Sequence, residues 1–262
     1  MIERKSQAEI EVMRAAGKIV AAVHALCREL AKPGVTTGEL DEAAEALIRS
    51  RGAVPTFKGY RSFPATLCLS IDSEVVHGIP SRKRVIQAGQ ILSVDVGATL
   101  DGLVADAATT LPIGDVDEEA QALLRVTEES LWRGLAQARE GNRVNDIGWA
   151  VETHIKRHGY GIVRDYGGHG VGYRLHEEPH IPNHGKPNTG PRIKVGYCLA
   201  IEPMVNIGGD DVRVLADNWT VVTADGTRSA HFEHSLAVTK DGPLILTLPD
   251  GAKQPFLGGA VL

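Results

Sequence analysis

The sequence is poor in cysteine, in aromatic residues and in long apolar runs. Its three cysteines are an odd number spaced far apart, which argues against a disulfide framework. Aromatic residues make up only 5% of the chain. No apolar run approaches the roughly 18 residues needed to span a bilayer, and the charged opening MIERKSQAEIEVMR lacks the apolar core of a signal peptide. These absences predict a soluble protein of a reducing compartment, and we expect a cytoplasmic location.

Charge of one sign is not concentrated anywhere in the chain. The 28 Lys and Arg against 33 Asp and Glu give a formal net charge of −5, and no block of like charge occurs. Net acidity without a basic patch argues against direct binding of nucleic acid or of an anionic membrane. What the chain does have is 29 Gly and 10 His, a composition that points to tight backbone turns around something polar.

Two pairs of helices are predicted from apolar spacing and helix-start signals. The first helix is expected over 6–31. Thr36 followed by Glu39 forms a capping-box signature for the second, which should end near residue 51. A further pair is expected near 117–139 and 144–158. Between the pairs, short runs with strand periodicity predict strands in ATLCLSI, GQILSVDVGA and LVADAATTLPI.

The chain repeats itself at an offset of about 107 residues. AKPGVTTGELDEAAEALIRSRG lies over AREGNRVNDIGWAVETHIKRHG, and without a gap GQILSVDVG lies over GYCLAIEPM, which pairs Asp95 with Glu202. We interpret the chain as an α+β protein formed by one domain over 1–262. Its related halves are expected at 1–114 and 115–250, followed by a loose tail at 251–262.

Each half carries a second carboxylate after the first. Asp106 follows Asp95 by 11 residues, and Glu233 follows Glu202 by 31, so the second half contains about 20 inserted residues. The insert includes an Asp-Gly turn and is expected to form an extra hairpin.

The spacing of Asp95 and Asp106 places both acids on one face of a predicted hairpin. A loop centred between Leu100 and Asp101 sets them directly opposite, whereas a loop on Asp101-Gly102 makes them a diagonal pair. Either register leaves their Cβ atoms roughly 4.5–8 Å apart. Two anions so close among apolar neighbours repel unless a proton or a cation lies between them. For this pair alone, two solvated hairpin acids remain the alternative.

A histidine completes the set of candidate ligands. Glycines surround His169 in GGHGVG, as expected where backbone must approach a ligand, although a loop residue is the simpler interpretation of such a histidine alone. Four carboxylates and one imidazole suit a pair of divalent cations about 3.5–4 Å apart. The residues therefore predict a dinuclear metal hydrolase.

Five ordered motifs, namely DVGATLDGLVAD, GGHGVG, LHEEPHIP, AIEPM and HFEHSLAVT, resemble those of the type I methionine aminopeptidases. These are M24-like metallopeptidases with the pita-bread fold. KSQAEIEVMRAAGKIVAAV and LCLSIDSEVVHGIP extend the resemblance over nearly the whole chain. It implies metal-dependent hydrolysis that removes initiator methionine from nascent proteins, with a small second residue preferred.

The resemblance also implies a ligand set and an acid/base group. Asp106 and Glu233 would bridge two divalent ions, Asp95 would complete one site, and His169 with Glu202 the other. Cobalt, manganese, iron and zinc all suit such oxygen and nitrogen ligands. Glu202 would also handle the protons of the attacking water.

Two further histidines match family positions that contact the substrate. His77 corresponds to a residue near the scissile amide, and His176 to one that hydrogen-bonds the substrate carbonyl. The methionine pocket implied by the resemblance is lined by His77 together with Tyr60, Phe63, Cys68 and Trp219. Aromatic walls and a soft sulfur suit a thioether.

The chain departs from the family near this pocket. Phe57 stands where many relatives carry a cysteine, and Leu175 precedes His176 where many carry an aromatic residue. Both changes concern pocket shape rather than the class of reaction. The remaining histidines are expected on the surface or in packing, and two of them flank Glu233 closely enough to be its partners: His24, His154, His158, His180, His184, His231 and His234.

Other functions remain as alternatives. An X-Pro aminopeptidase or prolidase of the same fold usually carries an additional N-terminal domain, whereas this chain starts at the first helix. A type II enzyme would need a helical insert of some tens of residues between His169 and Glu233, for which the spacing leaves no room. A catalytically inactive binding homologue would show a decayed ligand set. The partners we expect are nascent polypeptide N-termini at the ribosome, bound by a monomer.

Overall fold

The computed structural model describes residues 2–252 and contains the four predicted helices within two residues of their expected ends. They are α1 (Gln7–Leu30), α2 (Thr37–Ser50), α3 (Glu118–Gln137) and α4 (Val144–Arg157). The tail expected at 251–262 lies outside the described residues, apart from its first two positions.

The strands fall between and after the helix pairs, as the alternating runs predict. Those of the first half are β1 (Val54–Pro55), β2 (Leu67–Ile71), β3 (Glu74–Val76), β4 (Ile91–Leu100) and β5 (Leu103–Pro112), with a short 3₁₀ turn η1 (Tyr60–Ser62). Those of the second half are β6 (Gly161–Ile162), β7 (Gly167–Gly170), β8 (Glu177–Pro182), β9 (Cys198–Ile201), β10 (Met204–Asn206), β11 (Val212–Val214), β12 (Val221–Thr223), β13 (Ser229–His231), β14 (His234–Thr239) and β15 (Gly242–Ile245). The α+β class is confirmed.

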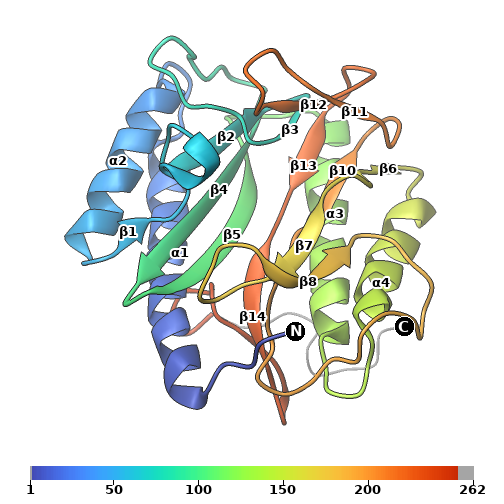
Figure 1. Cartoon of the computed structure of the whole chain (residues 1–262). Helices are drawn as coiled ribbons and strands as arrows, with labels where there is room; N and C mark the ends of the chain where they lie inside the picture. Colours follow the sequence, from blue (N-terminus) through green and yellow to red (C-terminus); the bar gives the residue numbers. More distant parts are fainter. Residues whose placement is uncertain (1, 253–262) are drawn as a thin grey trace.

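The strands form a central layer with one helix pair on each side (Figure 1). In the first half β4 pairs with β1, β2 and β5, and in the second half the strand order is β15-β14-β9-β7-β8. The expected hairpin in the insert is β11–β12, and β12 also pairs with β3 of the first half. The insert of the second half therefore reaches across to the first.

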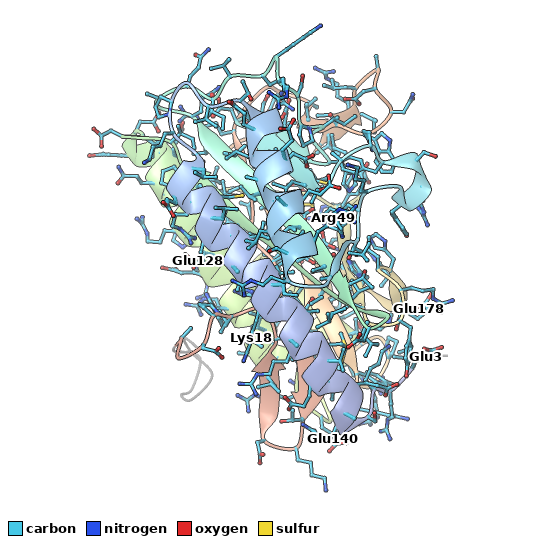
Figure 2. All side chains as sticks on the ribbon, turned by 90° about the vertical axis from the view of Figure 1, so that its left-hand side faces the viewer. Glu3, Lys18, Arg49, Glu128, Glu140 and Glu178 are labelled. Atoms are coloured by element: carbon cyan, nitrogen blue, oxygen red, sulfur yellow. The ribbon has the colours of Figure 1, made fainter. Side chains whose placement is uncertain are left out.

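Helix starts are set by side chains that accept the first free backbone N–H groups. The Thr36 backbone N–H donates to Glu39 Oε2 (2.8 Å), and the Thr36 hydroxyl accepts from Glu39 N–H, which confirms the predicted capping box. The start of α4 repeats the contact, since Arg143 N–H donates to Asp146 Oδ2 (2.7 Å). Figure 2 shows α1 and α2 from outside, with Lys18 and Arg49 among the charged side chains on their exposed surfaces.

The two halves correspond in backbone conformation as well as in element order. Helix α4 begins 107 residues after α2 (144 − 37) and ends 107 residues after it (157 − 50). Glycines at equivalent positions share a positive φ that other residues rarely adopt: Gly34 and Gly141 (96° and 97°), Gly52 and Gly159 (75° and 77°), Gly89 and Gly196 (85° and 89°). These correspondences support the interpretation of a repeat.

Each helix pair covers its own apolar core. Val20, Leu40 and Val94 belong to the core between α1, α2 and the first-half strands, and Leu123 and Leu199 to the core under α3 and α4. All five are fully buried, and burying one such side chain contributes about 1.5–3 kcal/mol. Within the described part of the chain, no helix is long and apolar enough to cross a membrane. The three cysteines, all described, are buried and free.

Candidate metal centre

The two aspartates of the first half lie on the longest hairpin of the molecule. Asp101 (φ 47°) and Gly102 (φ 80°) form its two-residue loop, and both left-handed conformations are those of a tight hairpin turn. Gly97 pairs with Asp106, and Asp95 pairs with Ala108. The acids are therefore a diagonal pair on one face, so the Asp101-Gly102 register is correct and the directly opposed one is wrong.

The two glutamates of the second half lie in interruptions of their strands. Glu202 occupies the two-residue break between β9 and β10, and Glu233 the break between β13 and β14. His234 pairs with Ile201 before the break and His231 with Met204 after it, so the unchanged register places Glu202 opposite Glu233. Such irregularities re-aim side chains, and here both carboxylates face the pocket.

Strand β5 joins the two halves through buried hydroxyls. We call this junction of β5 with the segment from His231 to Ser235 the seam. At its centre, Glu233 N–H donates to the Ala108 carbonyl (2.9 Å). On one side the Ser235 hydroxyl donates to the Asp106 carbonyl (2.7 Å) and accepts from Asp106 N–H (3.0 Å). On the other side the Thr110 hydroxyl makes the same two contacts with the backbone of His231 (2.8 and 2.9 Å). The backbone of Asp106 is thereby fixed against the opposite half.

His169 on β7 points one ring nitrogen at the acids. Its Nδ1 lies 2.9 Å from the Gly170 carbonyl, which can only accept, so Nδ1 carries the proton. Nε2 is then a free lone pair, 3.5 Å from Glu202 Oε1 and 4.0 Å from Asp106 Oδ2. Burial lowers the pKa of His169 to about 3 and keeps the ring neutral, the form that binds metals.

The four carboxyl groups repel one another when they are ionised. Burial, and then repulsion from the neighbouring acids, raises the pKa of Asp95, Asp106, Glu202 and Glu233 well above their ordinary values. A cation among them would relieve both effects, because it supplies the opposite charge that the buried oxygens lack.

Unpartnered oxygens show that the donors fit a cation. One oxygen each of Asp95, Asp106 and Glu233 is buried without a hydrogen-bond partner. The ligand atoms of Asp106, His169 and Glu233 lie within 4.8 Å of one another. Buried, unpaired and convergent oxygen and nitrogen donors are the ligand set that divalent transition metals take.

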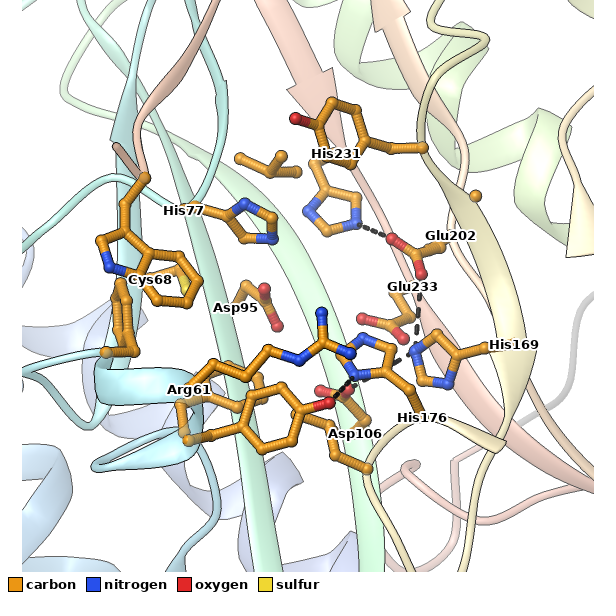
Figure 3. Close-up of a pocket in the computed structure, with 18 residues that line it drawn as sticks. Arg61, Cys68, His77, Asp95, Asp106, His169, His176, Glu202, His231 and Glu233 are labelled. Atoms are coloured by element: carbon orange, nitrogen blue, oxygen red, sulfur yellow. Dashed lines mark hydrogen bonds and ion pairs between the residues drawn. The ribbon is translucent and has the colours of Figure 1, made fainter. Parts of the chain in front are cut away.

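These acids lie in a pocket of about 240 Å³ whose other end is apolar and aromatic (Figure 3). The Phe63 and Trp219 rings meet edge to face with centroids 5.1 Å apart, and His77 packs edge-on against Trp219 at 5.9 Å. His77 has a left-handed backbone (φ 62°), an uncommon conformation that occurs at functional sites. Burial lowers the pKa of His77 to about 4, so this imidazole is neutral.

His176 joins the aromatic end to the acids. Its ring lies 4.3 Å from that of His169, and its Nδ1 lies 2.9 Å from the Tyr60 hydroxyl. Burial is the main cause that lowers the pKa of His176. The Tyr60 contact holds the ring so that its other nitrogen is available to a ligand.

All twelve sequence-predicted site residues line this one pocket. They are Phe57, Tyr60, Phe63, Cys68, His77, Asp95, Asp106, His169, His176, Glu202, Trp219 and Glu233. The substituted Phe57 fits because Gly97 on β4 has no side chain: a Cβ there would lie 2.8 Å from the Phe57 ring. Leu175 is also buried at the pocket wall.

One prediction about the glycines is largely wrong. Gly168 and Gly170, beside His169, do not make room for a ligand. A Cβ on Gly168 would lie 2.3 Å from the Ala200 carbonyl, and one on Gly170 2.2 Å from the Glu178 carbonyl. These glycines let β7 pack closely between neighbouring backbones, and only Gly167 borders the pocket.

Three polar pocket residues were not expected in the site: Arg61, Tyr166 and His231. His231 is placed by sequence among packing residues or partners of Glu233. It is 2% exposed, and its Nε2 lies 3.6 Å from Glu202 Oε2 instead. The other flanking histidine, His234, bonds Thr247 through Nδ1 (2.8 Å). No sequence signal separates His231 from His234, because the strand break that turns Glu233 inward lies between them.

The sequence pattern of metallopeptidase family M24 matches residues 11–240. The chain belongs to this family. It is 50% identical over 247 residues to methionine aminopeptidase 1 of Bacillus subtilis, across 94% of this chain and 99% of that protein. It is 47% identical over 254 residues to methionine aminopeptidase 1 of Mycobacterium tuberculosis, across 95% and 96% of the two chains.

Solved structures of M24 enzymes agree with this assignment. The crystal structure of methionine aminopeptidase from Thermotoga maritima has a TM-score of 0.93 and 42% identity, covering 95% of this chain and 100% of that one. The prolidase of Pyrococcus horikoshii, at 22% identity and a TM-score of 0.76, shares the fold over 94% of this chain and 64% of its own. The resemblance to methionine aminopeptidases and the pita-bread fold are confirmed. Methionine aminopeptidase activity is favoured over the prolidase alternative, which shares the fold.

Proposed function

We propose that this M24 metallopeptidase removes the N-terminal methionine of peptides by metal-dependent hydrolysis, with a small second residue preferred. One observation carries the proposal: buried, unpartnered carboxylate oxygens from both halves meet beside an apolar aromatic pocket. The similarity to methionine aminopeptidases over nearly the full chain supports the same activity. The preference for a small second residue rests on the resemblance of the motifs.

The proposed site holds two divalent cations. Asp106 and Glu233 would bridge them, Asp95 would complete one site, and His169 with Glu202 the other. When bound, such cations polarise a scissile carbonyl and lower the pKa of a nearby water. Cobalt, manganese, iron and zinc all suit the donors, and we make no choice among them.

The chain's own side chains would manage protons and orientation. Glu202 would take a proton from the attacking water and return it to the nitrogen of the leaving amine. Tyr60 would donate to Nδ1 of His176, which leaves Nε2–H to donate to the substrate carbonyl oxygen as negative charge develops on it. His77, held neutral by burial, would contact the scissile amide.

The apolar end would bind the methionine side chain. Phe57, Phe63 and Trp219 provide aromatic surface, and Cys68 adds a buried thiol whose pKa is raised well above its ordinary value by burial. A flexible thioether packs well against aromatic rings and sulfur. His77 and Tyr60 complete the lining of the same pocket.

The biological setting is proposed from the same resemblance. We infer that nascent polypeptide N-termini at the ribosome are the substrates, that the enzyme acts in the cytoplasm, and that it is a monomer without direct contact to nucleic acid. The glycine and helix correspondences support one domain of two halves, 1–114 and 115–250.

Hydrolysis of defined peptides tests the activity. The metal-loaded protein should release Met from Met-Ala-Ser, should leave Met-Leu-Ser largely intact, and should not cleave Ala-Pro. The chelated protein should cleave none of them. Cleavage of Ala-Pro without cleavage of Met-Ala-Ser would overturn the proposed function in favour of a proline-specific peptidase.

A further inference from the structure

One cationic side chain lies over the mouth of the pocket. Arg61 lines the pocket and is exposed, and its guanidinium carbon lies 5.4 Å from the centroid of the Tyr60 ring. Figure 3 shows its side chain reaching toward His176 and the acidic residues. It is close enough to His176 to help lower the pKa of that imidazole, after the larger effect of burial.

An unusual turn holds Arg61 in this position. Arg61 (φ 46°) and Ser62 (φ 72°) are consecutive non-glycine residues in the left-handed region, which side chains disfavour. The turn is closed by Gly59 N–H donating to the Phe63 carbonyl (2.8 Å) and Phe63 N–H donating to the Tyr60 carbonyl (2.9 Å). Tyr60 and Phe63 on either side of the turn both line the pocket, so the turn places Arg61 beside the pocket opening.

The guanidinium has no ion pair with a carboxylate among residues 2–252. Lys58, three positions earlier on the same segment, is different: its Nζ lies 2.6 Å from Glu45 Oε2, and it does not border the pocket. The charge of Lys58 is therefore compensated within the protein, whereas that of Arg61 is directed at whatever occupies the mouth.

We propose that Arg61 is a specificity-determining residue that favours substrates with an acidic side chain shortly after the cleaved bond. The inference rests on the proposed function. If the aromatic end holds the methionine and the acids face the scissile amide, the remainder of the peptide leaves through the mouth, past Tyr60 and Arg61. A carboxylate on the third residue of the substrate would then meet the guanidinium, which forms forked hydrogen bonds with carboxylates.

The expected preference is modest, because the mouth is open to solvent. Exposed charge pairs are weak and are screened over about 8 Å at physiological ionic strength. We expect kcat/KM for an acidic third residue to exceed that for a basic one by about 3- to 10-fold, and the ratio to fall as salt is added.

The test uses metal-loaded protein and the peptides Met-Ala-Asp-Ser, Met-Ala-Ser-Ser and Met-Ala-Lys-Ser. The ratio of kcat/KM for the Asp peptide to that for the Lys peptide should drop close to one in Arg61→Gln and remain above one in Arg61→Lys. Lys58→Gln, which removes an equal charge from the same segment, should keep the wild-type ratio.

The outcomes separate this inference from the proposed function. Cleavage of all three peptides at equal rates by the wild type, or an unchanged preference in Arg61→Gln, overturns the role of Arg61 alone. A preference that disappears equally in Lys58→Gln also overturns it, because the effect would then be one of general surface charge. Failure to cleave any Met peptide overturns the proposed function, and this inference with it.

Discussion

The two halves of the molecule follow one plan but present their acids differently. In the first half β4 and β5 are continuous, and Asp95 and Asp106 form a diagonal pair. In the second half the chain is interrupted between β9 and β10 and between β13 and β14, and Glu202 lies opposite Glu233. The longer glutamate side chains start from the strand breaks, while the aspartates start from a regular sheet. A repeat can therefore keep its donors in place while local strand geometry changes, if side-chain length changes with it.

The halves also differ in what else they bring to the pocket. The first half supplies most of the apolar end, including Phe63 and Cys68, whereas the second supplies the imidazoles of His169 and His176. The inserted β11–β12 hairpin carries its Trp219 back onto the first half. Neither half alone holds both the ligands and the binding pocket.

The largest effect should come from breaking the bridge between the halves. Asp106→Asn removes a carboxylate charge proposed to be shared by both cations and leaves the volume of the side chain nearly unchanged. We expect metal binding by calorimetry to fall sharply and hydrolysis of Met-Ala-Ser to fall to the level of chelated enzyme. A variant that keeps two cations and full turnover would show that the halves do not share this ligand.

The equivalent acids Asp95 and Glu202 should separate ligand loss from proton transfer. Asp95→Asn and Glu202→Gln each remove a carboxylate that is proposed to bind one of the two cations, so each should bind about one Mn²⁺ less than wild type. Glu202→Gln should lose a further factor of about 10²–10⁴ in kcat, the usual contribution of general acid–base catalysis. Equal losses of kcat in both variants would contradict a special role for Glu202.

His176 tests the contribution of the second half to carbonyl stabilisation. His176→Ala should lower kcat by about 10²–10³-fold at normal metal content, as expected for loss of one donor to the developing oxyanion. Tyr60→Phe should have a smaller effect in the same direction, because it only releases the ring. An unchanged kcat in His176→Ala would make this histidine structural.

Replacing Ser235, whose hydroxyl bonds the Asp106 backbone, should lower the cation affinity less than replacing a proposed ligand does. Ser235→Ala leaves the Asp106 backbone without its two hydroxyl contacts, and a lost supporting contact typically costs about 10–100-fold in metal affinity. Ser235→Thr keeps the hydroxyl and should retain most of the wild-type metal affinity. Thr127→Ala removes an equally buried hydroxyl, bonded to the Leu123 carbonyl (2.7 Å) in α3, and should reduce stability but not Mn²⁺ affinity. Equal affinity losses in both Ala variants would contradict a positioning role.

The smallest effect concerns how the stability of the metal-free protein depends on pH. The pKa of Asp106 is raised in the folded state above its ordinary value of 3.8, so its contribution to stability is present below that pH and is lost as pH rises through the folded pKa. The amide of Asp106→Asn cannot ionise, so this variant does not lose stability in that way as the pH rises. Its Tm advantage over wild type should therefore grow as the pH rises above 3.8, with each 1 kcal/mol giving about 2–4 °C. An advantage that shrinks with pH would contradict the raised pKa.

Local and repeated signals explain what could be predicted from the sequence. The capping box of Thr36 and Glu39 located a helix start, and the offset of 107 residues led from Asp95 to Glu202. The strand break at Glu202 coincides with Pro203, a residue that cannot donate to a strand partner. The break at Glu233 has no such mark and depends on pairing between distant strands. Arg61 and His231 reach the pocket only through an unusual turn and through one such break.

The central claim is that the two halves hold one shared pair of cations. Electron paramagnetic resonance of the protein with two equivalents of Mn²⁺ tests it most directly, because two ions that shared the proposed ligands Asp106 and Glu233 would be magnetically coupled. The account predicts a coupled spectrum at two equivalents that is absent from Asp106→Asn. Two bound ions that give only the six-line signals of isolated Mn²⁺ would contradict it.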